Sequence, residues 1–375
     1  MATTHPGPPG PGYTMAADTP KARLVSTVES LIRVPTQRVG FAIVGLGRAG
    51  HFHLTSMKAV VDIATLRWVI DADEALARHV GERERCDAST RIEDALNDGS
   101  VHAVVIASVT HTHFAFCKAA LHAGKAVFTE KPVSHDPAEL AEIIELAKRC
   151  GKPFIVGYQR RVDPNFRELR RQVREQQSIG SVRLVKCCSR DNPLPPLEYL
   201  RVSGGIFYDM LCHDFDLIHF LTGQLPTEVY SAAHCYNAQI AAMDDVDTVI
   251  VSMKFASGLL AVVDCSRTAS YGYDQRVEVF GSLGMAAAHN QLESTVVVSD
   301  AHGHLHPPSQ WSFPQVMACT QPCHHLAISA RLPTPPCGVH AQARLYLVCT
   351  AVQAHVHDRA SRVRRSGQGR RMRAR

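Results

Sequence analysis

Residues 41–50 read FAIVGLGRAG. The apolar run 41–44 predicts a fully buried strand, because parallel sheets covered by helices on both faces favour continuous hydrophobic strands. The run leads directly into Gly45, Gly47 and Gly50, which have G-x-G-x-x-G spacing. In that pattern the first glycine permits a tight turn, the second lets the backbone approach a pyrophosphate, and the third lets the next helix pack closely. The stretch therefore predicts a strand, a phosphate-binding turn and a helix.

The residues that follow fit a dinucleotide site. A helix is expected from about 49 to 60, and Arg48 and Ala49 lie where its first N–H groups would face the pyrophosphate. The next strand, residues 65–70, ends in Asp71. A carboxylate there accepts hydrogen bonds from the adenosine ribose and repels a 2′-phosphate, which favours NAD over NADP. Because of Arg48 and Arg67, NADP remains the less favoured alternative cofactor. The alternative without a ligand is a glycine turn that has only a structural role.

Alternation of strands and helices continues to residue 158. Strands are expected at 101–107, 125–129 and 153–158, with a helix at 137–150. This alternation predicts a doubly wound domain over residues 37–158. Polar side chains follow the strand ends, where such sheets bind dinucleotides. The expected cofactor contacts there are Ser108, Thr110, His113, Glu130 and Lys131.

Three motifs in this order carry a family resemblance. They are the glycine turn at 45–50, Glu130-Lys131-Pro132, and GGIFYDMLCHDFD at residues 204–216. Over roughly residues 38–315 the chain resembles the glucose-fructose oxidoreductase and inositol 2-dehydrogenase family, also called Gfo/Idh/MocA, and most closely its inositol 2-dehydrogenase-like members. The resemblance implies an α/β protein with an N-terminal Rossmann doubly wound parallel sheet and a C-terminal α/β domain whose open sheet is mostly antiparallel. It also implies hydride transfer between a nicotinamide and a sugar or cyclic polyol, and a cis bond before Pro132.

The same residues suit alcohol oxidation on chemical grounds. Oxidising a secondary alcohol requires a hydride acceptor and a base that takes the hydroxyl proton. His213 titrates near neutrality and is the natural base, while Lys131 would stabilise negative charge developing on oxygen. Asp209 lies four residues before His213, and Asp216 three after it, so a regular helix would place them on one face. Asp209 would orient the hydroxyl or stabilise a charged imidazole, although an Asp–His pair on a helix is more often an ordinary surface pair.

The resemblance also matches residues to roles. It places Lys131, Asp209 and His213 at the catalytic positions of the family. It places substrate contacts at Arg161, Asp191, Asn192 and Tyr273, whose polar groups suit ring hydroxyls. The plain alternative for these four is a loop salt bridge or a packed aromatic ring.

A second domain is expected over residues 159–315. Residues 181–190, 245–255, 258–265 and 275–282 alternate in the manner of sheet strands, and 256–258 suit a hairpin turn. A broad sheet of this kind often packs against another subunit. A homo-oligomer, either a dimer or a tetramer, is therefore expected.

Composition sets the outer limits. The chain has 375 residues, 45% hydrophobic and 20% charged, which is enough for a two-domain core. We see no run of about 18 apolar residues, so no membrane partner is expected. The twelve cysteines without a secretory signal favour free thiols and a cytoplasmic location. Residues 1–36 suit a flexible extension, and Asp18 and Glu29 weaken the alternative of a mitochondrial presequence.

The segment 316–375 differs from the rest. It has ten arginines, no lysine and one acidic residue, so it carries +9 and leaves −4 for residues 1–315 of a chain with net charge +5. We expect a basic, poorly ordered tail without the closing strand and helix that the family usually has. Its cysteines and histidines, Cys319, Cys323, His324, His325, Cys337 and Cys349, fit no standard zinc spacing, so no metal is predicted. Aromatic residues are nearly absent, so no nucleic-acid partner is expected either.

Two functions are compatible with these patterns. The favoured one is an NAD-dependent dehydrogenase for a sugar or an inositol-like polyol, in which Lys131 and His213 handle the hydroxyl proton. The alternative is a non-catalytic dinucleotide sensor or scaffold with an impaired C-terminus. The intact set Lys131, Asp209 and His213 favours the enzyme.

Overall fold

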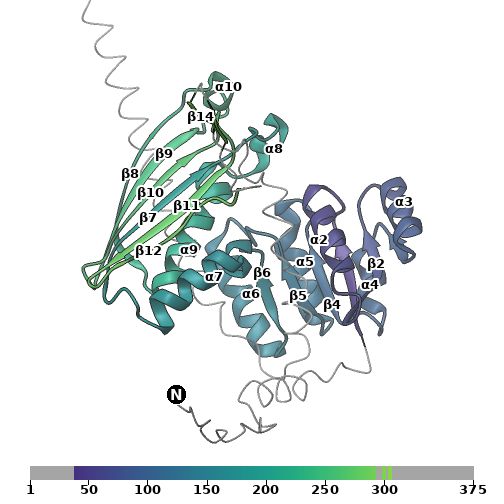
Figure 1. The fold of residues 1–375 in the computed structure, drawn as a ribbon. Coiled ribbons are helices and arrows are strands. Elements are labelled where there is room, and N and C mark those ends of the chain that lie inside the picture. Colours follow the sequence, from purple (N-terminus) through teal and green to yellow (C-terminus); the bar gives the residue numbers. More distant parts are fainter. Residues whose placement is uncertain (1–37, 293–297, 301–302, 306–375) are drawn as a thin grey trace, which may run out of the picture. The chain divides into compact units, whose positions relative to one another are not determined.

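The structure is a computed structural model that describes residues 38–292, 298–300 and 303–305 (Figure 1). From Val39 onward the described residues belong to one compact unit. The predicted N-terminal extension, the basic tail and the cysteines and histidines considered for zinc lie outside the described residues. None of the described helices combines the length and the apolarity needed to cross a bilayer.

The first sheet has six parallel strands in the order β3-β2-β1-β4-β5-β6. Its strands are β1 (Val39–Val44), β2 (Ala64–Ile70), β3 (Asp87–Ser89), β4 (Ala103–Ile106), β5 (Ala126–Thr129) and β6 (Phe154–Val156). Its helices are α2 (Arg48–Lys58), α3 (Glu74–Glu84), α4 (Ile92–Asn97), α5 (Thr110–His122) and α6 (Pro137–Cys150). This strand order is that of the dinucleotide-binding doubly wound fold, so the expected Rossmann sheet is confirmed.

Strand β1 has no polar face because helices cover both sides of the sheet. Phe41 and Ile43 pack into one buried cluster with residues of α2 and α3. Ala42 and Val44 point the other way, into a cluster with residues of α5 and α6. Successive side chains of a strand point to opposite faces, so a strand buried on both faces must be apolar throughout.

Helix α6 has the bounds that its sequence predicts. The Asp136 carboxylate accepts a hydrogen bond from the backbone N–H of Ala138 at 2.8 Å, and Pro137 occupies the first turn. Gly151 ends the helix with a φ of 59°, a left-handed conformation that glycine adopts without strain. An Asx cap, an N-terminal proline and a C-terminal glycine are local signals, which is why the sequence alone locates both ends.

The second sheet has the strand order β12-β11-β7-β10-β9-β8. Its strands are β7 (Val182–Arg190), β8 (Pro226–His234), β9 (Thr248–Phe255), β10 (Leu260–Ser266), β11 (Asp274–Gly281) and β12 (Met285–Ala288), and the separate pair is β13 (Val298–Asp300) with β14 (Gly303–Leu305). The helical segments are η1 (Gln159–Val162), α7 (Pro164–Arg170), η2 (Arg171–Glu175), α8 (Leu197–Val202), η3 (Phe207–Leu211), α9 (Cys212–Thr222) and α10 (Ala238–Ala241). Only β7 and β10 pair in parallel, so the prediction of a mostly antiparallel sheet is confirmed.

Two strands of this sheet, β8 and β12, were not predicted from the sequence, and one predicted strand is too long. In β8 only Ser231 is buried, and β12 is short and alanine-rich, so neither has a clear apolar alternation. The predicted strand 245–255 begins only at Thr248. Asp247 lies just before it, and its carboxylate accepts hydrogen bonds from the backbone N–H groups of Tyr236 and Asn237.

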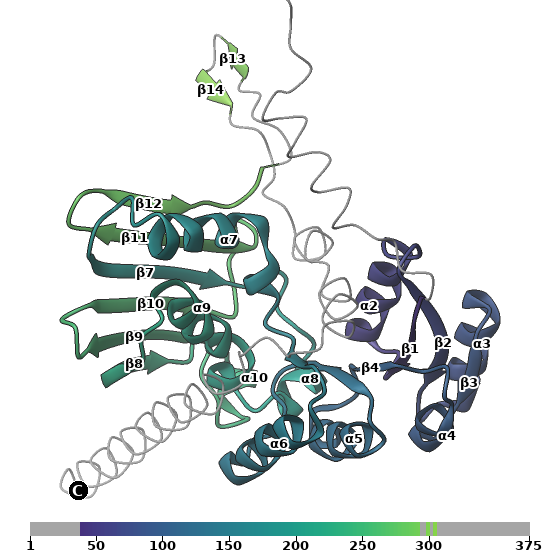
Figure 2. The same cartoon turned by 90° about the horizontal axis from the view of Figure 1, so that it is seen from below.

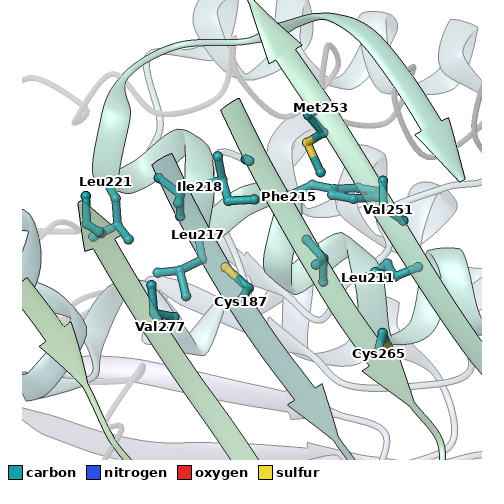
Figure 3. Packing of buried hydrophobic residues seen from close by; sticks show 14 of the residues in the cluster. Cys187, Leu211, Phe215, Leu217, Ile218, Leu221, Val251, Met253, Cys265 and Val277 are labelled. Atoms are coloured by element: carbon teal, nitrogen blue, oxygen red, sulfur yellow. The ribbon is translucent and has the colours of Figure 1, made fainter. Parts of the chain in front are cut away.

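One face of the second sheet packs against α7 and α9, which lie across the strands in Figure 2. Figure 3 shows Phe215, Leu217 and Ile218 of α9 among side chains from β7, β9, β10 and β11. At the start of this helical segment, Phe207–Leu211 forms a π-helix before the α-helix begins at Cys212. The sequence suggested one regular α-helix through Asp209 and His213. The π-helix shows that this expectation was wrong. The buried apolar face nevertheless fixes the segment that holds both residues.

Candidate functional site

A cavity of about 1690 Å³ lies at the carboxyl ends of the first sheet's strands. Residues from both sheets line it, because the segments 189–199 and 209–213 complete its wall. Open doubly wound sheets bind ligands at this edge. The cavity contains the glycine turn, the loops after β4, β5 and β6, and all three predicted catalytic residues.

The glycine turn has the geometry of a dinucleotide cradle. Gly45 has a φ of 89°, and a Cβ there would lie 2.4 Å from the backbone nitrogen of Ser108. A Cβ on Gly50 would lie 2.0 Å from the carbonyl oxygen of Gly45, whereas one on Gly47 would meet nothing within 4 Å. Gly47 therefore leaves open backbone facing the cavity. No side chain caps α2, and its first turn has no acidic residue, so its N–H groups suit an anionic pyrophosphate.

Asp71 is attached to this turn. One carboxylate oxygen accepts a hydrogen bond from the backbone N–H of Leu46 at 2.7 Å, and the other accepts one from the N–H of Asp73 at 3.0 Å. Each carboxylate oxygen has a second acceptor position, so the group can still bind a ribose hydroxyl. Asp71, Gly45, Gly47, Arg48 and Ala49 all line the cavity, as a cofactor site requires.

The loops after β4 and β5 are braced by two buried histidines. The ring nitrogens of His113 lie 2.7 Å from the Pro132 carbonyl and 2.9 Å from the Ser108 carbonyl. His53 of α2 lies 2.9 Å from a carboxylate oxygen of Glu130. Burial opposes ionisation of Glu130, but the hydrogen bond and charge of His53 lower its pKa overall. Ser108, Thr110, His113 and Glu130 line the cavity, and the His113 ring lies between the Pro132 and Ser108 carbonyls of the two loops.

Lys131 is held by Asp209. Its ammonium group donates to the backbone oxygen of Asp209 at 2.5 Å and to the carboxylate at 3.1 Å. Burial alone would lower the pKa of Lys131, but the Asp209 carboxylate raises it above its ordinary value. The cis bond at Lys131–Pro132, which the family resemblance implied, is present. Lys131 is therefore a positively charged donor at the cavity wall.

Asp209 is surrounded by donors. Its Oδ1 also accepts from the Tyr199 hydroxyl at 2.6 Å, and its Oδ2 accepts from Arg267 at 2.9 Å. Arg267 is fully buried and also binds Asp245 at 3.1 Å. Burial would raise the pKa of Asp209, but Lys131 and Arg267 lower it, so the carboxylate stays ionised. Because both oxygens are engaged by these groups, Asp209 orients Lys131, and no described hydrogen bond joins it to His213.

His213 has the properties of a base. Its side chain is buried at the cavity wall, and burial together with the charges of Lys131 and Arg160 lowers its pKa well below its ordinary value. The imidazole is therefore neutral at pH 7 and can accept a proton. Its Nδ1 has no hydrogen-bond partner among the described residues. A substrate hydroxyl or an ordered water would satisfy such a group.

The four predicted substrate residues all line the cavity, but in different states. The Arg161 guanidinium makes two hydrogen bonds, 2.7 and 2.6 Å, to the carboxylate of buried Asp216. Arg161 thus forms the salt bridge that the sequence analysis gave as the alternative to a substrate contact, and Asp216 is its partner. Asn192 donates to the Ala269 carbonyl at 2.6 Å, and Tyr273 is buried at the wall. Burial and the charge of Asp209 raise the pKa of Asp191 to about 6.

Sequence reasoning missed several residues that organise the site. Arg160 is buried and donates to Asp214 at 2.6 Å and to Ser189 at 2.8 Å. Tyr199 and Arg267 both bind Asp209. Arg267 follows directly after strand β10, and a charged residue at the end of an apolar strand is a signal that could have been used.

Two family models match the chain. Residues 39–158 match an oxidoreductase family with an NAD-binding Rossmann fold, and residues 166–287 match the GFO/IDH/MocA C-terminal domain. The chain belongs to the Gfo/Idh/MocA family. The two matched segments contain the glycine turn, Lys131, Asp209 and His213, and the second ends before the predicted tail begins.

Relatives and a solved structure agree with this family membership. The myo-inositol 2-dehydrogenase of Thermotoga maritima is 40% identical over 268 residues, which cover 71% of this chain and 79% of that protein. The inositol 2-dehydrogenase of Rhizobium meliloti is 37% identical over 271 residues, or 72% and 81% of the two chains. The crystal structure of a myo-inositol dehydrogenase from Corynebacterium glutamicum has a TM-score of 0.79 at 28% identity, covering 86% of this chain and 97% of that one.

Membership of the Gfo/Idh/MocA family confirms two expectations from the sequence. The fold is a Rossmann sheet followed by a mostly antiparallel sheet, and the class is that of dehydrogenases acting on CH–OH groups. The favoured function of an oxidoreductase is thereby supported over the sensor. In this Gfo/Idh/MocA protein, the cavity brings the predicted cofactor residues and the predicted catalytic residues to one place.

Proposed function

We propose that the protein is an NAD-dependent dehydrogenase that oxidises a secondary hydroxyl of an inositol-like cyclic polyol. The observation that carries this proposal is the convergence of Lys131, Asp209 and His213 on the cavity that contains the glycine turn. When bound there, the nicotinamide supplies the hydride acceptor. The names of the relatives support an inositol as the substrate class.

The chain's own groups divide the proton chemistry. The neutral imidazole of His213 accepts the hydroxyl proton as the carbonyl forms. The Lys131 ammonium donates a hydrogen bond to the same oxygen and stabilises the negative charge that develops on it. Asp209 keeps Lys131 charged and oriented. In the direction of ketone reduction, a protonated His213 returns the proton.

Substrate binding is proposed for the wall of the cavity that holds the predicted substrate residues. Asp191, Asn192 and Tyr273 offer acceptors and donors that suit the hydroxyls of a polyol ring. Arg161 contributes to this wall through its pair with Asp216.

The proposal is tested with two measurements on the full chain. NADH binding is followed by fluorescence, and oxidation of a panel of inositols and sugars is followed at 340 nm. We expect NADH binding and turnover of at least one inositol isomer. Binding without any turnover would favour the non-catalytic sensor, and folded protein that does neither would contradict both functions.

The cofactor preference is predicted to depend on the charge of Asp71. Asp71→Asn keeps an acceptor for the Leu46 N–H but removes the negative charge that repels a 2′-phosphate. We expect the kcat/KM preference for NAD over NADP to fall about tenfold, the effect of roughly 1.4 kcal/mol. Steady-state kinetics with both cofactors measures this, and exposed Asp62→Asn is the matched control. An unchanged preference would show that Asp71 does not select the cofactor.

The pH dependence is predicted to reflect Asp191 and not His213. The pKa of Asp191 is raised to about 6, so the carboxylate is ionised above that pH and loses its charge below it. The pKa of His213 lies well below 6.5, so its neutral form persists through the same range. We expect kcat/KM for the oxidation to fall about tenfold per pH unit below pH 6. The inflection should disappear in Asp191→Asn; if it remains, another group controls it.

We infer that the protein is a homo-oligomer. The outer face of the second sheet exposes Leu260, Phe280 and Met285, and Leu184 lies between the first two in the strand register. This apolar row crosses four adjacent strands and suits the same row of a second copy. Light scattering coupled to size exclusion tests the oligomeric state.

We also infer a cytoplasmic location, because the cysteines within the described ranges are free thiols, as expected in a reducing compartment.

A further inference from the structure

Tyr199 lies between the two halves of the proposed site. It belongs to α8, and its half-buried side chain lines the cavity. Its ring lies against the Arg48 side chain, whose guanidinium carbon is 5.3 Å from the ring centroid. Its hydroxyl binds Asp209. One side chain therefore touches both the dinucleotide turn and the carboxylate that holds Lys131.

The hydroxyl acts on the atom that orients the lysine. It donates to Oδ1 of Asp209 at 2.6 Å, and Lys131 donates to the same oxygen at 3.1 Å. Burial raises the pKa of Tyr199 to about 12, so the hydroxyl keeps its proton at neutral pH and remains a donor. With Arg267 on Oδ2, the carboxylate is fixed from both sides. Removing the hydroxyl would leave Lys131 as the only described donor to Oδ1, while Arg267 still binds Oδ2.

The ring acts on the first residue of α2. Arg48 follows Gly47, the glycine that leaves open backbone facing the cavity. A guanidinium stacked on an aromatic face is attracted by the ring's quadrupole and loses part of its conformational freedom. The contact thus holds the Arg48 charge beside the position expected for the pyrophosphate.

We propose that Tyr199 is a positioning residue that couples the dinucleotide turn to the catalytic lysine, with its ring orienting Arg48 for the cofactor and its hydroxyl orienting Asp209 for Lys131. This inference rests on the proposed function. It predicts that the two tasks can be separated by substitution, because the ring and the hydroxyl contact different partners.

Tyr199→Phe and Tyr199→Leu separate the two tasks. Phenylalanine keeps the ring, so we expect the dissociation constant of NADH to change less than twofold while kcat falls about tenfold, through the loss of a hydrogen bond to a charged group. Leucine removes both, so the dissociation constant should also rise about fivefold. Tyr271→Phe is the matched control. It removes a tyrosine hydroxyl bound to Asp274 at 2.6 Å but away from the cavity lining, and should leave both constants unchanged.

A double-mutant cycle tests the stacking directly. If Arg48 acts through the ring, Arg48→Met combined with Tyr199→Leu should bind NADH no more weakly than the weaker single variant. Fully additive losses in the cycle would overturn the inference, as would unchanged kcat in Tyr199→Phe or equal changes of kcat and NADH affinity in that variant. The NADH measurements need no substrate. If the wild type binds NADH but oxidises no polyol, the proposed function fails, while the cycle still decides whether Tyr199 orients Arg48.

Discussion

Replacing Lys131 by methionine is expected to lower kcat for polyol oxidation by about 10³-fold, the order of effect when a donor to the developing oxyanion is lost. Lys131 is the positively charged donor that Asp209 holds at the cavity wall. Methionine has a similar length but neither charge nor donor. Asp209 keeps Tyr199 and Arg267 as partners in the variant, so the carboxylate does not become an unpaired buried charge. We therefore expect the protein to stay folded and to bind NADH within about threefold of the wild type.

The measurement combines steady-state kinetics with an NADH titration of the same preparation. Lys118→Met is the control, because Lys118 pairs with Glu142 at the surface and lies outside the cavity lining. Lys131→Arg keeps the charge but changes the position of the donors, and should recover only part of the activity. A methionine variant that keeps more than a tenth of wild-type kcat would show that Lys131 does not take part in the chemical step.

Replacing Arg267 by methionine is expected to destabilise the fold by about 3–5 kcal/mol, the range for breaking a buried ion pair by removing one partner. Arg267 is fully buried and binds Asp209 at 2.9 Å and Asp245 at 3.1 Å. Without it, Asp245 loses its cationic partner and Asp209 retains only Lys131 and the Tyr199 hydroxyl. The cost arises mainly from carboxylates left in a poorly hydrated environment.

Urea unfolding followed by circular dichroism measures this loss, with thermal melting as a second readout. Arg171→Met is the matched control: Arg171 pairs with Glu168 on the exposed surface, where solvent screens the pair, so little change is expected. Arg267→Lys keeps one charge but cannot bridge both carboxylates in the same way, so its stability should lie between those of wild type and Arg267→Met. If Arg267→Met unfolds at the wild-type urea concentration, the buried network does not stabilise the fold.

Short-range patterns in the sequence predicted five of the six strands of the first sheet, and β3 is the one that they missed. The glycine spacing at 45–50, the apolar runs of the strands and the caps of α6 each depend on residues close together in the chain. The second sheet was predicted less completely. Strands β8 and β12 bury too few alternating side chains to be recognised as strands from the sequence. No local signal marks the π-helix that precedes α9.

The sequence by itself determined the cofactor turn, the strands of the first sheet other than β3 and the delivery of Lys131 to a strand end, because these follow from local backbone preferences and continuous apolar runs. Only the tertiary structure decided which charges meet. Asp209 binds Arg267 across 58 residues, Arg160 binds Asp214 across 54, and Arg161 is paired with Asp216 across 55. Partners so distant in the chain are selected by packing and burial, and burial also shifts the pKa of His213. The physical reason is that charge pairing in a poorly hydrated interior depends on where separate elements are brought together, which residue spacing does not encode.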